Sequence, residues 1–81
     1  MNVRVRLFAV ARQLAGAEAA ELELPPGSTV ADLRRALVAR YPQLGRLDRH
    51  LRFAVQAEYA GEATPIPENA DVACIPPVSG G

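Results

Sequence analysis

The stretch PPGSTVADLRRALVARYP, residues 25–42, decides the fold because it carries the clearest helix signal in the chain. Its apolar residues recur at helical spacing: Val30, Leu33, Leu37 and Tyr41. Its arginines populate the opposite, solvent-facing side: Arg34, Arg35 and Arg40. Thr29 and Asp32 have the spacing of a capping box, and Pro42 stops the helix. We therefore predict an amphipathic helix of about three turns that packs on a sheet through its apolar stripe.

Two segments upstream of the helix alternate in the manner of half-buried strands. In residues 3–8, one face carries Val3, Val5 and Leu7. The other face carries Arg4, Arg6 and Phe8. Residues 18–24 alternate in the same way, and residues 9–16 between them predict a turn or short helix ending at Gly16. So short a connection favours an antiparallel pair of strands.

Downstream of the helix, residues 43–51 form an ambiguous connector, and residues 52–56 predict a third strand. Residues 57–70 are rich in turn formers, with room for a very short strand near 64–66. Residues 71–75 predict the last strand. One mixed sheet with one main helix packed on a single face is the economical α+β arrangement, and we expect one domain over residues 1–81.

The composition excludes several classes of function. The formal net charge is zero, so nothing favours binding to nucleic acid or to a membrane surface. No apolar run is long enough to cross a bilayer, and no leader signal opens the chain, so we expect a cytoplasmic protein. All nine basic residues are arginine. Lysine chemistry, including a lysine acceptor for an isopeptide bond, is therefore absent from this chain.

Conventional catalytic sets are also missing. The single histidine, His50, lies in a polar connector and is expected to be solvated. The single cysteine, Cys74, shares the strand parity of Val72, so we expect a buried and inert thiol. There is no cluster of metal ligands and no glycine-rich phosphate loop. We expect no bound cofactor or metal, and no catalysis by the domain alone.

Strand parity indicates a surface for a partner. If Val5 and Val72 face the helix, Phe8 and Ile75 face the open side of the sheet, and Tyr59 lies close enough to join them. Three large apolar side chains on one open face are typical of a docking surface. The alternative is that they are scattered exposed hydrophobic residues, which are normal on proteins.

The chain ends in PPVSGG, an extended tail over residues 76–81. Pro76 and Pro77 cannot donate the hydrogen bonds of a sheet, so the sheet should end there. The four residues that follow reach roughly 13 Å when extended. Glycine at the tip lets the backbone enter a tunnel too narrow for a side chain, and Gly81 offers an unhindered carboxylate. Such a carboxylate needs activation, typically by ATP as an acyl adenylate, before it accepts sulfur or an amine.

Two motifs carry a resemblance that runs from end to end. The first is an F-A-x-x-R segment, here Phe8, Ala9 and Arg12, and the second is the P-P-V-S-G-G ending. With the strand–strand–helix–strand order, the chain resembles the ubiquitin-like β-grasp fold, and more closely the small subunits of molybdopterin synthase, the MoaD type of sulfur carrier. It departs from the family pattern where V-N-G is replaced by residues 55–57, and where Gly-Asp is replaced by residues 70–71.

The resemblance implies a mechanism. An adenylyltransferase similar to ubiquitin-activating enzymes would use ATP to load AMP onto Gly81, and a sulfur donor protein would convert the adenylate to a thiocarboxylate. The tail would enter the large catalytic subunit through Pro77, Val78, Ser79 and Gly80. There it would give sulfur to cyclic pyranopterin monophosphate within a heterotetramer. The implied partner interface consists of Phe8, Arg12, Tyr59 and Ile75, although Arg12 equally fits a structural ion pair.

Other functions remain open from the sequence. The same chemistry at Gly81 serves carriers for thiamin thiazole synthesis or tRNA thiolation, although the Pro-Pro ending favours molybdopterin. A ubiquitin-like protein modifier would instead join its tail to lysines of other proteins. A purely structural domain with an inert tail fits the two motifs least well. Molybdenum and tungsten pathways share the pterin step, and the sequence does not separate them.

Overall fold

The N-terminal part forms an antiparallel pair of strands, as predicted. The computed structural model describes residues 1–77, and in it β1 (Asn2–Leu7) pairs with β2 (Ala19–Glu23). The connection contains α1 (Ala9–Ala15), which ends at Gly16 in the left-handed conformation, with φ of 71°. Glycine reaches this conformation without steric cost, so the short helix terminates there and the chain turns back into β2.

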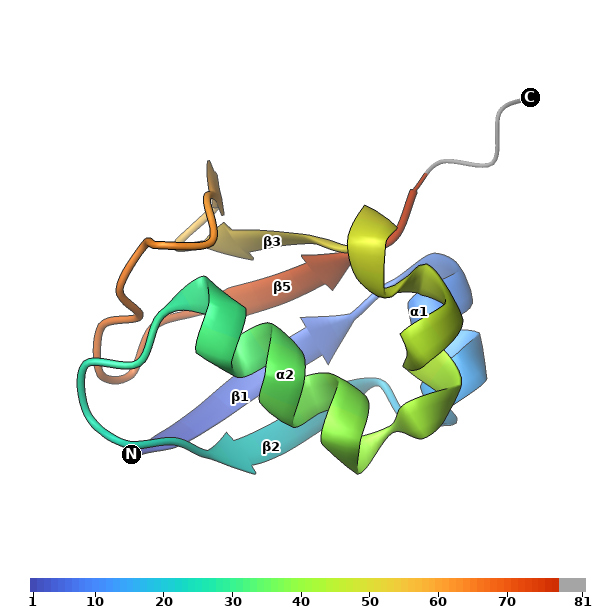
Figure 1. Cartoon of the computed structure of the whole chain (residues 1–81), viewed down its shortest axis with the longest axis horizontal. Helices are drawn as coiled ribbons and strands as arrows, with labels where there is room; N and C mark the ends of the chain where they lie inside the picture. Colours follow the sequence, from blue (N-terminus) through green and yellow to red (C-terminus); the bar gives the residue numbers. More distant parts are fainter. Residues whose placement is uncertain (78–81) are drawn as a thin grey trace.

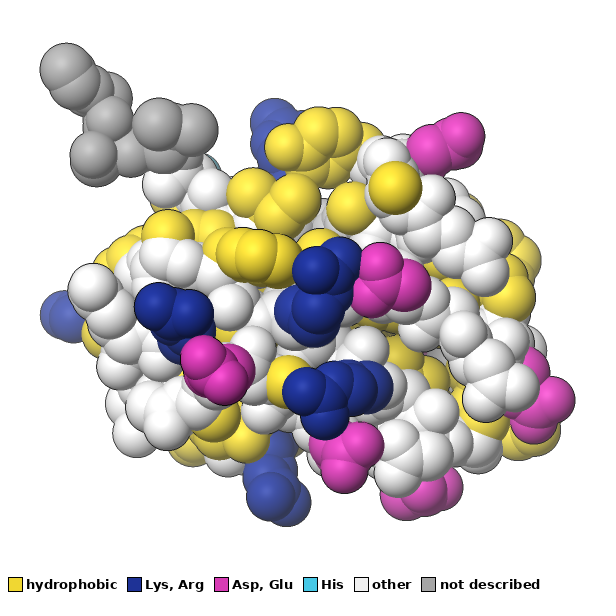
Figure 2. Space-filling view, turned by 180° about the vertical axis from the view of Figure 1, so that it is seen from behind, with side chains coloured by type: hydrophobic (Ala, Val, Ile, Leu, Met, Phe, Trp, Pro, Cys, Tyr) yellow, Lys and Arg dark blue, Asp and Glu magenta, His cyan; other side chains and the backbone are white. Residues whose placement is uncertain are grey.

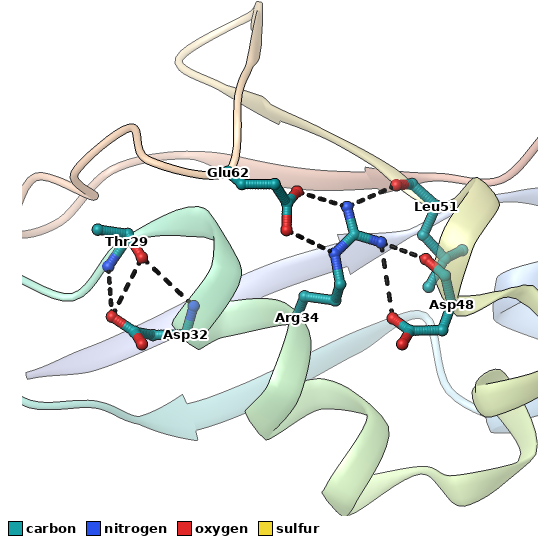
Figure 3. A network of polar contacts seen from close by, with 6 residues as sticks. All are labelled: Thr29, Asp32, Arg34, Asp48, Leu51 and Glu62. Atoms are coloured by element: carbon teal, nitrogen blue, oxygen red, sulfur yellow. Dashed lines mark hydrogen bonds and ion pairs between the residues drawn. The ribbon is translucent and has the colours of Figure 1, made fainter.

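The main helix, α2 (Val30–Arg40), has the predicted start and end. The Thr29 side chain accepts a hydrogen bond from the Asp32 backbone N–H, and the Asp32 carboxylate accepts one from the Thr29 backbone N–H at 2.9 Å (Figure 3). This reciprocal cap also lowers the pKa of Asp32, because the backbone hydrogen bond favours the charged carboxylate. The ambiguous connector is a 3₁₀ helix, η1 (Pro42–His50).

The C-terminal part completes a sheet of five strands within residues 1–77. β5 (Val72–Ile75) pairs in parallel with β1 and antiparallel with β3 (Arg52–Val55), which in turn pairs with β4 (Glu58–Ala60). The strand order is β2-β1-β5-β3-β4, so the first and last strands meet in the middle. The predicted α+β architecture, a mixed sheet with one main helix on one face, is confirmed (Figure 1).

The core lies between α2 and the sheet. The strands contribute alternate residues to it, and α2 contributes the positions that the sequence predicted, Val30, Leu33 and Leu37. Each of these three helix residues is fully buried. α1 and η1 lie at the end of the sheet where β1 and β5 terminate (Figure 1). None of the helices within residues 1–77 is long and apolar enough to cross a membrane.

The predicted short strand was misplaced. Residues 64–66 contribute only one isolated bridge, between Thr29 and Pro65, whereas β4 forms directly after β3. The two strands are joined by Gln56 and Ala57, both with positive φ, at 52° and 68°. This is the backbone pattern of a tight hairpin turn that asparagine and glycine usually provide. The chain therefore makes this tight turn with Gln56 and Ala57 in place of asparagine and glycine.

The prediction that Arg34 lies on the wet side of α2 is wrong. Its side chain is only 18% exposed and its guanidinium lies 5.1 Å from the centre of the Phe53 ring. Nε and Nη2 donate to the Glu62 carboxylate at 3.0 and 2.7 Å, and Nη2 also donates to the Leu51 carbonyl at 2.9 Å (Figure 3). Nη1 donates to the Asp48 carbonyl and lies 3.6 Å from the Asp48 carboxylate. η1 and the loop after β4 thus close over this arginine.

Candidate functional site

None of the helices within residues 1–77 covers the face of the sheet opposite α2, and the predicted apolar residues meet there. Phe8, Tyr59 and Ile75 border one shallow depression of about 460 Å³. We call this depression the docking surface; it is also lined by Arg6, Ala54, Ala57 and Ala73. Hydrophobic side chains gather on this side of the molecule in its upper part (Figure 2). The predicted convergence of the three residues is therefore found, and their role in binding remains a prediction.

The strands explain why the docking surface is hollow. Ala54 of β3 lies between its two cross-strand partners, Tyr59 of β4 on one side and Ala73 of β5 on the other. Alanines make a low floor, whereas Phe8 and Tyr59 stand at the margins with 41% and 70% of their surfaces exposed. Ile75 is half-buried at the end of β5. Small residues surrounded by large exposed ones form a concave apolar surface suited to a partner's side chains.

An ion pair that the sequence did not predict lies at one margin of the docking surface. Arg6 donates from Nε and Nη2 to the two oxygens of Asp71 at 3.0 and 2.9 Å. Its guanidinium also lies 5.4 Å from the centre of the Phe8 ring. A bidentate pair fixes the direction of an arginine side chain better than a single contact does. The signal was available in principle, because Arg6 and Asp71 lie on the same face of two neighbouring central strands.

Arg12 lies apart from the docking surface. It extends from α1, is 56% exposed, and its Nη1 lies 3.8 Å from the Glu18 carboxylate, which is also exposed. Exposed ion pairs of this length contribute little to stability. Both interpretations of Arg12, a partner contact and a structural ion pair, therefore remain predictions.

The tail leaves the domain beside a second cleft. Pro76 is buried and Pro77 is exposed, as expected for the point where the sheet ends. Pro77 lines a cleft of about 360 Å³ with side chains from η1, β3 and β4, including Arg49, Arg52 and Tyr59. Tyr59 thus borders this tail-exit cleft and the docking surface alike. The remaining predicted tail residues, Val78, Ser79, Gly80 and Gly81, lie outside the described residues.

Cys74 and His50 are placed as the sequence predicted. Cys74 is fully buried in β5, and burial raises the pKa of its thiol to about 12, so it stays protonated and unreactive at neutral pH. His50 is exposed at the end of η1. Within residues 1–77, no three side chains of the types that ligate metals come together. The chemically distinctive features of the described part are therefore two surfaces, the docking surface and the tail-exit cleft.

Comparison with known proteins identifies the family. The family model described as the ThiS family matches residues 5–81, which is nearly the whole chain. The chain belongs to the ThiS family. The match includes the second half of β1, the docking surface and the complete PPVSGG segment, so it covers both regions that the sequence singled out.

Individual relatives of this ThiS-family chain carry two kinds of name. A "Molybdopterin synthase sulfur carrier subunit" from Caenorhabditis briggsae is 34% identical, over all of this chain and 99% of its own length. The crystal structure of SAMP1 from Haloferax volcanii superposes with a TM-score of 0.88 at 28% identity, with both chains covered completely. A putative molybdopterin converting factor, subunit 1, from Pyrococcus furiosus gives 0.84 at 30% identity, covering 95% of this chain and 98% of its own.

A more distant structure shares the fold alone. It is a chain in the complex of subunits 1 and 2 of molybdopterin-converting factor from Helicobacter pylori, with a TM-score of 0.68 at 22% identity and full coverage of both chains. The ubiquitin-like fold expected from the sequence is therefore shared with SAMP1, with a putative molybdopterin converting factor subunit and with a chain from a two-subunit complex.

Proposed function

We propose that this chain is the sulfur carrier subunit of a molybdopterin synthase. The observation that carries the proposal is the match to a named sulfur carrier subunit over all of this chain, including its Gly-Gly ending, and over 99% of the relative. The reacting group is then the Gly81 carboxylate.

The proposed chemistry proceeds in three steps at Gly81. An oxygen of its carboxylate attacks the α-phosphate of ATP on an adenylyltransferase, and pyrophosphate leaves. Sulfur delivered by a donor protein then replaces AMP at the carbonyl carbon, which gives a thiocarboxylate. The loaded tail enters the large catalytic subunit and transfers its sulfur to cyclic pyranopterin monophosphate. Water then cleaves the bond between the Gly81 carbonyl carbon and the transferred sulfur, so Gly81 returns to a carboxylate, ready for another cycle that supplies the second sulfur of the dithiolene.

The docking surface provides the means to bring the tail to each enzyme. A tail whose last four residues reach roughly 13 Å works only if the domain docks next to the active site. Apolar side chains held around an alanine floor bury area without having to rearrange. We assign Phe8, Tyr59 and Ile75 to contacts with the large subunit and, in turn, with the adenylyltransferase. Arg12 is assigned to the margin of that interface.

The test is the intact mass of the chain after incubation with ATP, a sulfur source and the adenylyltransferase of the same organism. We expect one oxygen-to-sulfur exchange, mapped to the last residue. Deleting Gly81, or replacing Gly80→Val, should leave the thermal unfolding midpoint unchanged and abolish sulfur transfer to the pterin. Normal transfer by either variant would contradict the tail mechanism.

A second candidate function is favoured by one observation. SAMP1 from Haloferax volcanii superposes with a TM-score of 0.88, and a second structure of it bears the name small archaeal modifier protein 1. A modifier would use the same adenylate but pass Gly81 to an amine of another protein. Mass spectrometry of cell extracts separates the two: thiocarboxylate with pterin sulfuration supports the carrier, and conjugates alone support the modifier. Thiocarboxylate that sulfurates tRNA or thiazole instead would assign a different client.

A further inference from the structure

The tail-exit cleft contains arginines in two different states. Arg34 is enclosed, and its charge is balanced by Glu62 and Asp48. Arg49 and Arg52 are exposed, and the ion pairs formed within residues 1–77 involve neither of them. The lining holds one acidic residue, Glu62, and it already binds Arg34 through both oxygens. The exposed pair therefore leaves uncompensated positive charge at this end of the sheet.

This positive charge is continuous with the docking surface. Arg52 begins β3 directly opposite Ile75 at the end of β5, so the two side chains are cross-strand neighbours on the open face. Tyr59 borders both hollows. A partner that covers Ile75 and Tyr59 consequently also reaches Arg52, and Arg49 lies beside it in the same lining.

The tail adds a geometric constraint. Pro77 lines the same cleft, and only four residues separate it from the end of Gly81. Their extended length is roughly 13 Å, so any enzyme acting on Gly81 must stand directly over the tail exit. The charge on Arg49 and Arg52 then faces that enzyme in every productive complex. A like charge on the enzyme there would weaken binding, whereas an acidic one would strengthen and orient it.

We propose that Arg49 and Arg52 bind carboxylate side chains at the tail entrance of the enzymes that receive Gly81. The inference rests on the proposed function, because it takes the tail to be the part that enters a partner. It assigns a chemistry to that partner: acidic residues at the entrance, next to an apolar patch that fills the docking surface. Arg49 and Arg52 lie at the rim of the proposed interface, where charge governs the association rate and the orientation of the complex.

The structure favours protein carboxylates over a phosphate of the nucleotide or pterin. With the tail extended, a phosphate attached at Gly81 lies roughly 13 Å from Pro77, which is beyond contact with the cleft. Arg49 and Arg52 also stand exposed on the rim rather than around an enclosed pocket. Phosphate sites usually add backbone N–H groups or a helix N-terminus to the cations. Arg49 instead lies in the last turn of η1.

The experiment measures binding of Arg49→Glu, Arg52→Glu and the double variant to the large synthase subunit and to the adenylyltransferase of the same organism. Arg46→Glu is the matched control, because Arg46 is an exposed arginine of the same η1 segment that does not line the cleft. At about 50 mM salt we expect the double variant to associate roughly tenfold to a hundredfold more slowly, with Arg46→Glu within about twofold of wild type. At about 500 mM salt the difference should largely vanish.

Each outcome decides the matter. If the double variant associates as Arg46→Glu does at low salt, while wild type binds normally, the inference is overturned and the proposed function stands. If wild type binds neither enzyme, the proposed function fails and the inference fails with it. If inorganic phosphate or AMP saturably shifts the amide signals of residues 49–52 in the isolated chain, the cleft is a small-anion site instead. Unchanged thermal midpoints would verify that the variants fold.

Discussion

On the face covered by α2, large aliphatic side chains from the strands and the helix interlock and are buried: Val5, Leu7, Leu33, Leu37 and Val72. On the open face, the central strands offer Ala54 and Ala73, while Phe8 and Tyr59 remain exposed at the margins. One sheet therefore carries two kinds of apolar surface. The covered one supplies free energy of folding, and the open one keeps apolar area in water until a partner covers it.

The two faces also differ in backbone strain. The residues with positive φ other than glycine are Ala9, Gln56, Ala57 and Asn69 within residues 1–77. Ala9 follows Phe8, and Ala57 itself lines the docking surface. Strain of this kind persists where surrounding structure holds it, and it often accompanies functional surfaces. The covered face is therefore closely packed, whereas the open face includes exposed apolar side chains and residues with strained backbone conformations.

The largest effect should come from breaking the covered face. Leu33→Ala removes a fully buried side chain from the interface between α2 and the sheet. We expect the free energy of unfolding to fall by about 3 kcal/mol, because the change loses burial and leaves a cavity. Chemical denaturation of the isolated chain measures this. Ala39→Ser, on the exposed side of α2, is the control and should change stability by less than about 0.5 kcal/mol.

A substitution on the open face should lower the affinity for a partner and leave the free energy of unfolding nearly unchanged. Tyr59→Ala removes the most exposed aromatic side chain of the docking surface. We expect affinity for the large subunit to fall by about 2 kcal/mol, as for an aromatic side chain that a partner covers, with stability nearly unchanged. Calorimetric titration measures the affinity, and thermal unfolding measures the stability. Equal losses of stability in Tyr59→Ala and Leu33→Ala would mean that the two faces do not differ in the way described.

The strain can be tested at the hairpin turn. Ala57→Gly retains the turn, in which residue 57 has φ of 68°, and relieves a side chain held in the left-handed region. We expect a gain of about 1 kcal/mol in the free energy of unfolding, reduced somewhat by glycine's greater freedom in the unfolded chain. Ala63→Gly, at an exposed turn without positive φ, is the control and should be neutral or slightly destabilising. Equal changes in the free energy of unfolding for Ala57→Gly and Ala63→Gly would argue against strain at residue 57.

The smallest predicted effect is a pH dependence at the Arg34 ion pair. The hydrogen bonds from Arg34 lower the pKa of Glu62 below its ordinary value of 4.5. A lowered pKa in the folded state stabilises the protein above about pH 4.5, and this contribution is lost as pH falls through the folded pKa. Thermal midpoints between pH 7 and 3 should therefore decline less in Glu62→Gln than in wild type. Glu68→Gln, an exposed glutamate outside the ion pairs formed within residues 1–77, should leave the decline unchanged.

Local signals in the sequence predicted most of the fold. The capping pair Thr29 and Asp32, the apolar spacing of α2 and the alternation of β1 and β2 each report on contacts within a few residues. β4 was missed because three residues are too few to display a period. Strand parity placed Phe8 correctly because it directly follows the alternating strand β1, and it placed Ile75 correctly because Ile75 lies within β5 itself, one residue after the buried Cys74.

The environment of charged residues was less accessible to sequence reasoning. Arg34 occupies a polar position on its helix, and only the packing of η1 and Glu62 around it makes it half-buried. These contacts join residues 14 to 28 positions apart, so no periodicity within α2 reveals them. The same limit applies to the tail-exit cleft, because η1, β3, β4 and Pro77 meet there only through tertiary structure.

The central pairing of β1 with β5 has a consequence for how the protein is made. Without β5, the sheet would separate into the β1–β2 pair and the β3–β4 pair, because no other strand joins them in the described structure. β5 follows the other four strands of the described sheet in the chain, so the sheet can close only after β5 has been synthesised. Pairing between β1 and β5 is a long-range contact, which generally slows folding. A nascent chain that ends before β5 would therefore lack both the closed sheet and the docking surface, because Ala73 and Ile75 belong to β5.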